Sequence, residues 1–510
     1  MSVTTRKKIL LVYPPLGISG TFVRHSPISL LYAASYAVKA GHEVEIFDAR
    51  LHPATWRGEL VAKIGSETLL VGISVMSGPP VRYAREIAEL CKRADPEVKV
   101  VWGGPFATFN PEIILDQDCN TDYVVNGYGA KTLHALVDNL VMGREIKPVP
   151  GLFMRGADGK TVGVLADWSC HEVIDYRDIP YHLIPNYTVY GQLDQKRVMF
   201  SLYSAMGCPY RCAFCSSPAL YKNVKSKRWQ PIPVEDVADH IQYLIDVYSA
   251  EYIYFIDDDS FVDVDHVEAL IDTINRRGIS VKLGFRGARI NEIKKMSHSF
   301  LDKLAAAGTD ILHIGAESGS DRLLKMVRKD CTVSDILACN SKLAQHPQIF
   351  AFYNFIVGLP TEDMEDLKTT AQLMLKLTNE NPKCIISTPN VFRPLQGTEL
   401  FDIASKQWGF QVPCSLDDWA DMEVETEYNL PWVDKAKKRF IHMMLLTSYF
   451  VDNKINKMKT GATLLMGVLR IVNNIYRPLA RLRLRCGFSG LLVERYVYDM
   501  AKRIMLRQTK

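Results

Sequence analysis

The chain has 510 residues, of which 47% are apolar and 23% charged, as is typical of globular proteins. Its length predicts several domains, and it contains no low-complexity tract or internal repeat. No apolar run is long enough to span a bilayer and no export signal is evident, so we expect a cytoplasmic protein whose eleven cysteines are thiols or metal ligands rather than disulfides.

Residues 7–142 alternate short apolar runs with helical segments. Val/Ile/Leu-rich runs between helices are typical of a parallel sheet buried on both faces. We therefore predict an α/β, doubly wound, flavodoxin-like (Rossmann-type) domain over residues 1–145. Ligands of such sheets bind beyond the carboxyl ends of the strands. The candidate ligand-binding residues at those ends are Ser74, Ser77, Gly103, Gly104, Gly127 and Gly129.

Three further segments follow. Residues 146–195 lose the alternation and gain prolines, so we interpret them as a connecting segment. Residues 196–425 again alternate strands and helices, in six predicted strand–helix units. This pattern favours a partial (β/α)6 barrel of the TIM type. Residues 426–510 are predicted to form a helical, basic C-terminal domain. The six barrel strands are predicted at 198–205, 252–257, 281–287, 311–316, 351–357 and 385–392.

Three cysteines, Cys208, Cys212 and Cys215, directly follow the first predicted barrel strand. Three thiolates this close can each bind one iron of a 4Fe–4S cluster. No fourth cysteine lies near by, so one iron would keep an open position able to chelate S-adenosylmethionine (SAM). A zinc site and a purely structural cluster are the alternatives, but zinc would normally require a further Cys or His near the triplet.

The spacing Cys-x-x-x-Cys-x-aromatic-Cys resembles the signature of the radical SAM superfamily. The resemblance implies that Phe214 lies near the adenine of SAM, and that Ile356 and Gly358 belong to an adenine motif on the fifth strand. It also implies that the acids closing the second strand contact the amino group of SAM. Arginine suits a carboxylate and acids suit an ammonium or a ribose hydroxyl. A structural acid or a solvated strand end is the alternative for each carboxylate. The implied SAM-binding residues are Phe214, Asp257, Asp258, Asp259, Arg289, Glu317, Ile356 and Gly358.

A doubly wound domain ahead of such a barrel resembles the cobalamin-binding radical SAM group, which includes class B methyltransferases and the anaerobic magnesium-protoporphyrin ester cyclases. The resemblance implies cobalamin at the glycine-rich strand ends. Phe106, Tyr128 and Ala130 depart from the group's usual motifs, and no Asp-x-His-x-x-Gly motif supplies a lower cobalt ligand. Another ligand, or none, is the alternative for this domain.

We expect methylation of an unactivated carbon through a 5′-deoxyadenosyl radical and methylcobalamin, as the resemblance implies. Cyclisation, oxygenation or rearrangement with the same cofactors is the first alternative. A non-catalytic iron–sulfur and cobalamin sensor is the second. The expected partners are a small-molecule, hydrophobic substrate and an electron donor such as flavodoxin or ferredoxin.

The C-terminal region is strongly basic: residues 454–510 contain thirteen Lys or Arg and two acids, a charge of +11. Arginines interleaved with apolar residues predict peripheral contact with anionic lipid headgroups. A capping helical domain with a solvated basic face is the alternative. We expect no nucleic-acid partner, because no recognisable binding module accompanies the charge.

Overall fold

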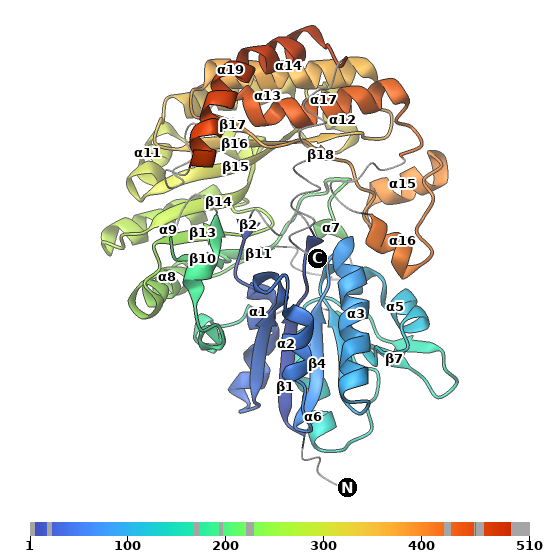
Figure 1. Ribbon diagram of the computed structural model, residues 1–510. Helices are drawn as coiled ribbons and strands as arrows, with labels where there is room; N and C mark the ends of the chain where they lie inside the picture. Colours follow the sequence, from blue (N-terminus) through green and yellow to red (C-terminus); the bar gives the residue numbers. More distant parts are fainter. Residues whose placement is uncertain are drawn as a thin grey trace.

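The computed structural model describes residues 6–17, 23–167, 173–192, 197–220, 229–422, 430–452, 454 and 464–490. Figure 1 shows two α/β units, with the N-terminal unit below the barrel and the C-terminal helices across the barrel's outer side. Each unit is built on its own sheet.

The N-terminal sheet has seven strands in the order β3-β1-β4-β5-β6-β7-β8. The first five in this order are parallel, and their 2-1-3-4-5 arrangement by position in the chain is the predicted flavodoxin-like topology. The strands are β1 (Lys8–Tyr13), β3 (Val44–Asp48), β4 (Thr68–Ser74), β5 (Lys99–Gly103), β6 (Tyr123–Val125), β7 (Leu152–Arg155) and β8 (Thr161–Gly163).

Helices cover both faces of this sheet because both faces of its central strands are apolar. Ile9 and Leu11 share a core with α1 and α6, whereas Leu10 and Val12 share one with α2, α3 and α5. The helices are α1 (Ile28–Lys39), α2 (Trp56–Ala62), α3 (Pro79–Ala94), α4 (Pro105–Phe109), α5 (Pro111–Gln117) and α6 (Ala130–Val141).

The segment predicted as a connection, 146–195, contains part of the first sheet. β7 pairs antiparallel with β6, and β8 pairs antiparallel with β7. These strands are short and lie at the sheet edge, so they lack the long apolar run that marks a buried parallel strand. The rest of the segment contains β9 (Gly191–Gln192), which pairs with β2 (Val23–Arg24), and three single-turn 3₁₀ helices.

The second sheet has the six parallel strands expected of the partial barrel, in the order β10-β13-β14-β15-β16-β17. The last predicted strand is divided, because β18 (Asn390–Val391) pairs separately with β16. The six strands are β10 (Met199–Leu202), β13 (Tyr252–Phe255), β14 (Lys282–Arg289), β15 (Thr309–Glu317), β16 (Phe350–Val357) and β17 (Cys384–Ile386).

Helices pack against the outer side of the barrel sheet. A short antiparallel pair, β11 (Ala205–Gly207) with β12 (Trp229–Pro231), and α7 (Ser217–Leu220) flank the cysteine triplet. The barrel helices are α8 (Val234–Tyr248), α9 (Val264–Arg276), α10 (Ile290–Lys295), α11 (His298–Ala306), α12 (Asp321–Met326), α13 (Val333–Ala344) and α14 (Met364–Glu380).

The last helices extend the two α/β units. α15 (Glu399–Gln407) and α16 (Leu416–Asp421) return to the N-terminal domain, where Trp419 lies in the core under α3. α17 (Lys435–Val451) and α19 (Leu464–Cys486) pack on α14 and contribute Phe440 and Leu484 to the barrel core. The predicted separate C-terminal domain is therefore, over its described residues, an added layer of the barrel. No helix of the described chain is long and apolar enough to cross a membrane.

Candidate active site

A cavity opens at the carboxyl ends of the parallel strands in the N-terminal domain. It has an empty volume of about 1050 Å³, part of it open to solvent. Five of the six predicted ligand-binding residues line it, but Ser77 does not. Tyr203 and Met206, from the barrel, complete the wall. The predicted lining residues are Ser74, Gly103, Gly104, Gly127 and Gly129.

Two adjacent glycines serve this cavity in different ways. A Cβ on Gly103 would have one atom within contact range, the Val125 carbonyl oxygen at 4.0 Å, so the cavity wall is open there. Gly104 has φ +90°, and a Cβ there would lie 2.9 Å from the Val75 nitrogen. Gly104 is therefore required by the backbone, whereas Gly103 leaves room for a ligand.

Asp257 occupies a different place from the one predicted. Its side chain is fully buried and accepts hydrogen bonds from the backbone nitrogens of Ser204 (2.7 Å) and Ala205 (3.0 Å) and from the Ser204 hydroxyl (2.7 Å). Burial raises the pKa of Asp257 to about 6. Both oxygens are engaged, so this carboxylate fastens the loop that leads to the cysteines instead of facing a ligand.

The cysteine loop is tied to the barrel through its middle residue. The Ala213 nitrogen donates to the Val327 carbonyl (3.0 Å), and the Ala213 carbonyl accepts from the Leu400 nitrogen (3.0 Å). Cys208, Cys212 and Cys215 are all free thiols on this loop, and burial raises the pKa of Cys208 and Cys215. Free thiols on one loop suit metal ligation, because bound iron stabilises the thiolate.

Arg289 lies behind the loop. Its Nη1 donates to the Cys212 sulfur at 2.8 Å, its Nη2 donates to the Lys329 carbonyl at 2.7 Å, and its guanidinium lies 3.9 Å from the centre of the Tyr210 ring. The predicted contact of Arg289 with the SAM carboxylate stays a prediction. Arg289 places a positive charge beside the Cys212 sulfur.

Asp259 and Glu292 form a pair of buried carboxyl groups near the cysteine loop. Asp259 and Glu292 are both almost fully buried, and burial together with Glu292 raises the pKa of Asp259. The Tyr210 hydroxyl donates to Glu292 Oε1 at 2.6 Å. Asp258, by contrast, is exposed and accepts from the Ser217 hydroxyl at 3.0 Å. Of the three predicted acids, Asp258 is the one that is exposed.

Glu317 forms a buried ion pair that sequence reasoning did not find. Lys329 Nζ lies 2.7 Å from Glu317 Oε1, and both side chains are almost fully buried. Glu317 also has φ +64°, a left-handed conformation that is uncommon outside glycine. Twelve residues separate the partners, and Lys329 has no motif of its own, so only the fold brings them together.

Phe214 and Ile356, both predicted near the adenine, border one apolar cluster that also contains Leu359 and Phe392. Gly358 has φ +78°; its nitrogen donates to the Glu362 carboxylate and its carbonyl accepts from Trp432 Nε1 at 2.9 Å. The structure therefore brings the three predicted adenine-binding residues to one edge of the barrel.

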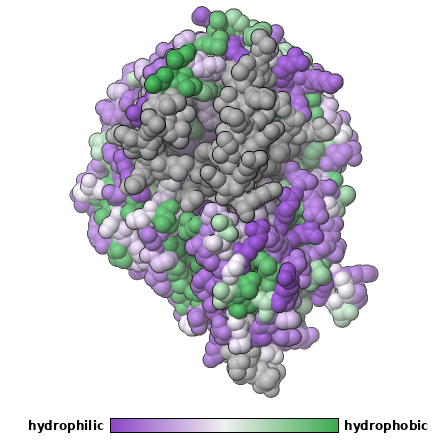
Figure 2. All heavy atoms as spheres, viewed as in Figure 1, coloured by the Kyte–Doolittle hydropathy of each residue, from purple (hydrophilic) through white to green (hydrophobic). Residues whose placement is uncertain are grey.

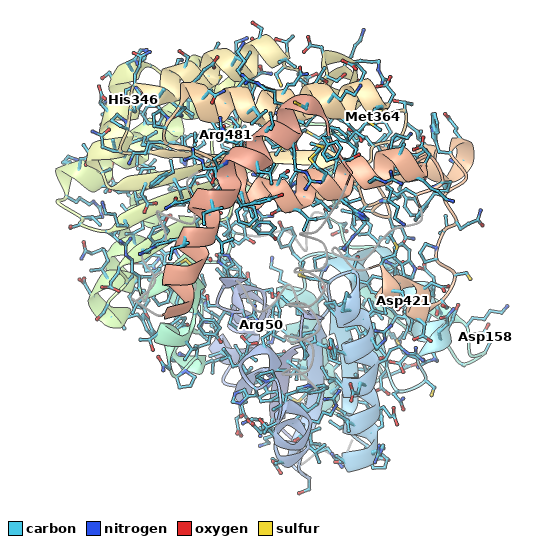
Figure 3. The ribbon with its side chains drawn as sticks, turned by 45° about the horizontal axis from the view of Figure 1, so that its top comes forward. Arg50, Asp158, His346, Met364, Asp421 and Arg481 are labelled. Atoms are coloured by element: carbon cyan, nitrogen blue, oxygen red, sulfur yellow. The ribbon has the colours of Figure 1, made fainter. Side chains whose placement is uncertain are left out.

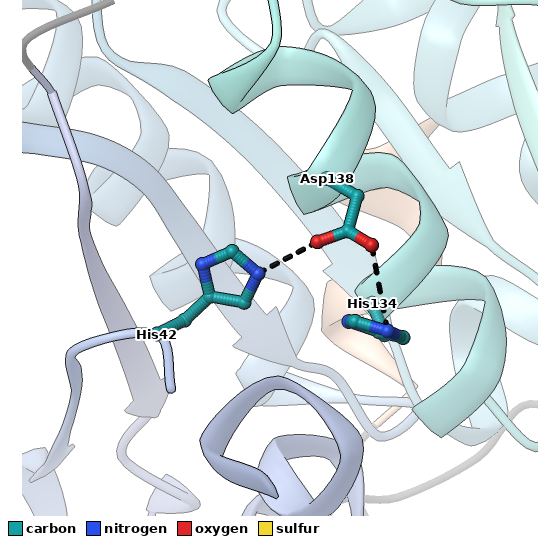
Figure 4. A group of neighbouring side chains, drawn as sticks. All are labelled: His42, His134 and Asp138. Carbon is teal, nitrogen blue, oxygen red and sulfur yellow. Dashed lines mark hydrogen bonds and ion pairs between the residues drawn. The ribbon is translucent and has the colours of Figure 1, made fainter. Parts of the chain in front are cut away.

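A separate group of metal-ligating side chains lies between α6 and the turn before β3 (Figure 4). Asp138 lies 2.7 Å from His42 Nε2 and 3.5 Å from His134 Nε2. The group joins α6 to the amino end of β3. The cavity lies beyond the opposite, carboxyl ends of the strands. We interpret the group as a structural hydrogen-bonded group.

Comparison with known families agrees with this arrangement. The model of the radical SAM superfamily matches residues 202–374, and the model of the B12 binding domain matches residues 21–137. The protein belongs to the cobalamin-binding radical SAM enzymes.

Individual relatives of this radical SAM enzyme cover most of its length. An uncharacterized methyltransferase of Pyrococcus horikoshii is 29% identical over 78% of this chain and 83% of its own. The anaerobic magnesium-protoporphyrin IX monomethyl ester cyclase of Synechocystis sp. is 23% identical over 86% of both chains. The structure of OxsB, a cobalamin-dependent S-adenosylmethionine radical enzyme, superposes with a TM-score of 0.71 at 17% identity, covering 94% of this chain and 72% of OxsB.

The family gives this radical SAM enzyme three cofactors: a 4Fe–4S cluster, SAM and cobalamin. The residues present fit them. Three free thiols share one loop, an apolar edge with a glycine turn lies beside that loop, and a glycine-walled cavity joins the two domains. The expected fold class, cofactors and enzymatic nature are confirmed, and the sensor alternative is set aside.

Proposed function

We propose that the protein is a methyltransferase that transfers a methyl group to an unactivated carbon of a small molecule. The observation that carries this proposal is the shared cavity, which Gly103 lines from the B12-binding sheet and Tyr203 and Met206 line from the barrel. Met206 lies two residues before Cys208. Cobalamin held in this cavity would lie near the cysteine loop, so a substrate on the barrel side of the cavity would lie between the two cofactor sites. Such positioning is the main contribution a protein makes to cofactor chemistry.

We assign residue roles from the contacts above. Cys208, Cys212 and Cys215 hold the cluster, and Arg289 positions Cys212. Phe214, Ile356 and Gly358 border the adenine, while Asp258 is the acid placed to meet the amino group of SAM. Bound together, the cofactors supply a hydrogen-abstracting radical and a transferable methyl group. The glycines of the cavity wall would let cobalamin approach the backbone, and apolar side chains line the cavity beside them.

Cyclisation or rearrangement with the same cofactors is the second candidate, because magnesium-protoporphyrin ester cyclases are among the relatives. Methyl transfer is favoured by relatives named as methyltransferases, including the Pyrococcus horikoshii protein and the hopanoid C-3 methylase of Methylococcus capsulatus, which is 24% identical over 78% of this chain.

The test is an anaerobic assay of the protein reconstituted with iron, sulfide and hydroxocobalamin, then supplied with SAM and a strong reductant. We expect 5′-deoxyadenosine and, only when cobalamin is present, S-adenosylhomocysteine. Cys212→Ala should abolish deoxyadenosine, whereas Cys119→Ala, at an exposed cysteine outside the site, should not. Deoxyadenosine without S-adenosylhomocysteine would contradict methyl transfer and favour the cyclase candidate.

We also propose that an electron donor of the flavodoxin or ferredoxin type reduces the protein.

We further propose that the protein makes peripheral contact with anionic lipid through α19. Figure 2 shows hydrophobic residues over this helix, where Ile471, Ile475, Leu479 and Leu482 are exposed. Arg481 and Arg483 do not contribute to the lipid contact, because Arg481 donates to the Val451 carbonyl and Arg483 is buried. Replacing the four apolar residues with glutamine should abolish sedimentation with phosphatidylserine vesicles; unchanged sedimentation would refute the contact.

A further inference from the structure

The inner face of the barrel carries a group of polar and aromatic side chains to which no cofactor-binding role has been assigned above. Successive residues of a strand point to opposite faces of the sheet. On β15, Leu312 and Ile314 pack beneath the helices, which leaves His313 on the inner face. The adjacent inner residue on β16 is Phe352, whose ring stacks on His313 at 4.3 Å.

Arg286 lies on this inner face and is exposed. Its neighbour Phe285 belongs to the helix-side core, so Arg286 points the other way. Within the described ranges, the Arg286 guanidinium has no ion pair and no hydrogen bond. Its positive charge nevertheless acts on three neighbours. It lowers the pKa of His25 and of His313, as burial also does, and it opposes the burial that raises the pKa of Tyr254.

Two neutral imidazoles lie close to Arg286. Burial and Arg286 lower the pKa of His25 and of His313 to about 4, so both rings can exchange hydrogen bonds at neutral pH without adding charge. The His25 ring stacks on Tyr254 at 5.5 Å, and its Nδ1 lies 3.3 Å from the Ser201 hydroxyl. His313 Nε2 is buried and has no hydrogen-bond partner within the described structure.

The segment that carries His25 is held in place from the N-terminal domain. Arg50, labelled in Figure 3, donates to the His25 carbonyl at 2.8 Å and forms a two-point ion pair with Asp48. Both Arg50 and Asp48 are buried. His25 is therefore a fixed element of the inner face, contributed by the domain that binds cobalamin.

Tyr203 connects this group to the cofactor cavity. It lines the cavity, and the charges of Arg286 and Asp258 both reach its hydroxyl. Among the described residues no ion pair joins Asp258 to Arg286, and Asp258 accepts a hydrogen bond from the Ser217 hydroxyl. Arg286 is exposed and has no anionic partner among the described residues, so its guanidinium is available to an anion that enters the inner face.

We propose that Arg286, with His313 beside it, binds an anionic group of the substrate, such as a carboxylate or a phosphonate. The aromatic rings of Tyr254 and Phe352 would contact the apolar part of that substrate. This inference rests on the proposed function, because it takes the inner face to be the substrate site. It narrows the expected hydrophobic substrate to one that carries a negative charge.

The experiment is a ligand-detected NMR titration of the reconstituted holoenzyme with phenylphosphonate and with its uncharged dimethyl ester. We expect saturable binding of phenylphosphonate and weaker binding of the ester. Arg286→Gln should raise the phenylphosphonate Kd by about tenfold. Arg286→Lys should raise it less, because the charge remains. Lys282→Gln, an exposed charge removal on the same strand, should leave it unchanged.

Several outcomes would overturn the inference: no saturable binding of phenylphosphonate to the wild-type protein, equal binding of the ester, or the wild-type Kd in Arg286→Gln. The absorbance of cluster and cobalamin in each variant shows that it is folded, and Arg286→Lys separates loss of charge from loss of packing. Failure of the S-adenosylhomocysteine assay with intact phenylphosphonate binding would refute methyl transfer alone.

Discussion

At the scale of single residues, the site depends on buried charged groups whose cost of burial is offset by polar partners. Lys329 and Glu317 illustrate this, since each removes the cost of burying the other. The same reasoning applies to Asp257, whose oxygens are satisfied by the backbone of the loop before the cysteines. These contacts hold the end of β15 and the loop before the cysteines in place.

Lys329→Met should destabilise the fold by about 3–5 kcal/mol, because it leaves the Glu317 carboxylate buried without a counter-charge. Adding Glu317→Gln should recover most of that loss, since the remaining pair is uncharged. Urea unfolding of the single and double variants measures both effects. A double variant no more stable than Lys329→Met would show that the pair is not coupled.

Glu362 makes stability depend on pH. Burial raises the pKa of Glu362 to about 8, whereas the pKa of a glutamate in the unfolded chain is about 4.3. The folded state therefore holds a proton that the unfolded state releases, and the free energy of unfolding should fall as pH rises from about 5 through 8. Glu362→Gln should flatten this dependence by on the order of 1–3 kcal/mol in urea unfolding. Exposed Glu365→Gln is the control and should not flatten it.

At the scale of elements, α16 joins the two α/β units. Trp419 packs edge-on to Phe106 at 5.8 Å and against Phe401 at 6.5 Å, and Asp421, labelled in Figure 3, forms an ion pair with Arg82 at the surface. Trp419→Ala should cost about 3–5 kcal/mol in thermal unfolding and should expose residues 399–422 to proteolysis. Asp421→Asn should cost less than about 1 kcal/mol, since its pair is exposed. Equal losses would contradict this ranking.

At the scale of the whole molecule, the C-terminal helices complete the barrel. Leu484 of α19 and Phe440 of α17 belong to the same core as the barrel strands, and Arg481 (Figure 3) bonds to Thr378 of α14. Deleting residues 464–510 should therefore lower the midpoint of thermal unfolding of the barrel by several degrees. An independent domain would leave that midpoint unchanged, so calorimetry of the shortened chain distinguishes the two arrangements.

The sequence by itself determined what depends on local spacing: the alternation of strands and helices, the two sheets, the cysteine triplet and the glycines at the strand ends. These follow from periodicity and short motifs, which need no long-range contact. Only the tertiary structure decided which residues meet. It turned Asp257 toward the backbone of Ser204, paired Glu317 with Lys329, brought His25 next to Tyr254 and made the C-terminal helices part of the barrel. Such contacts join residues far apart in the chain, and the burial that selects them exists only after folding.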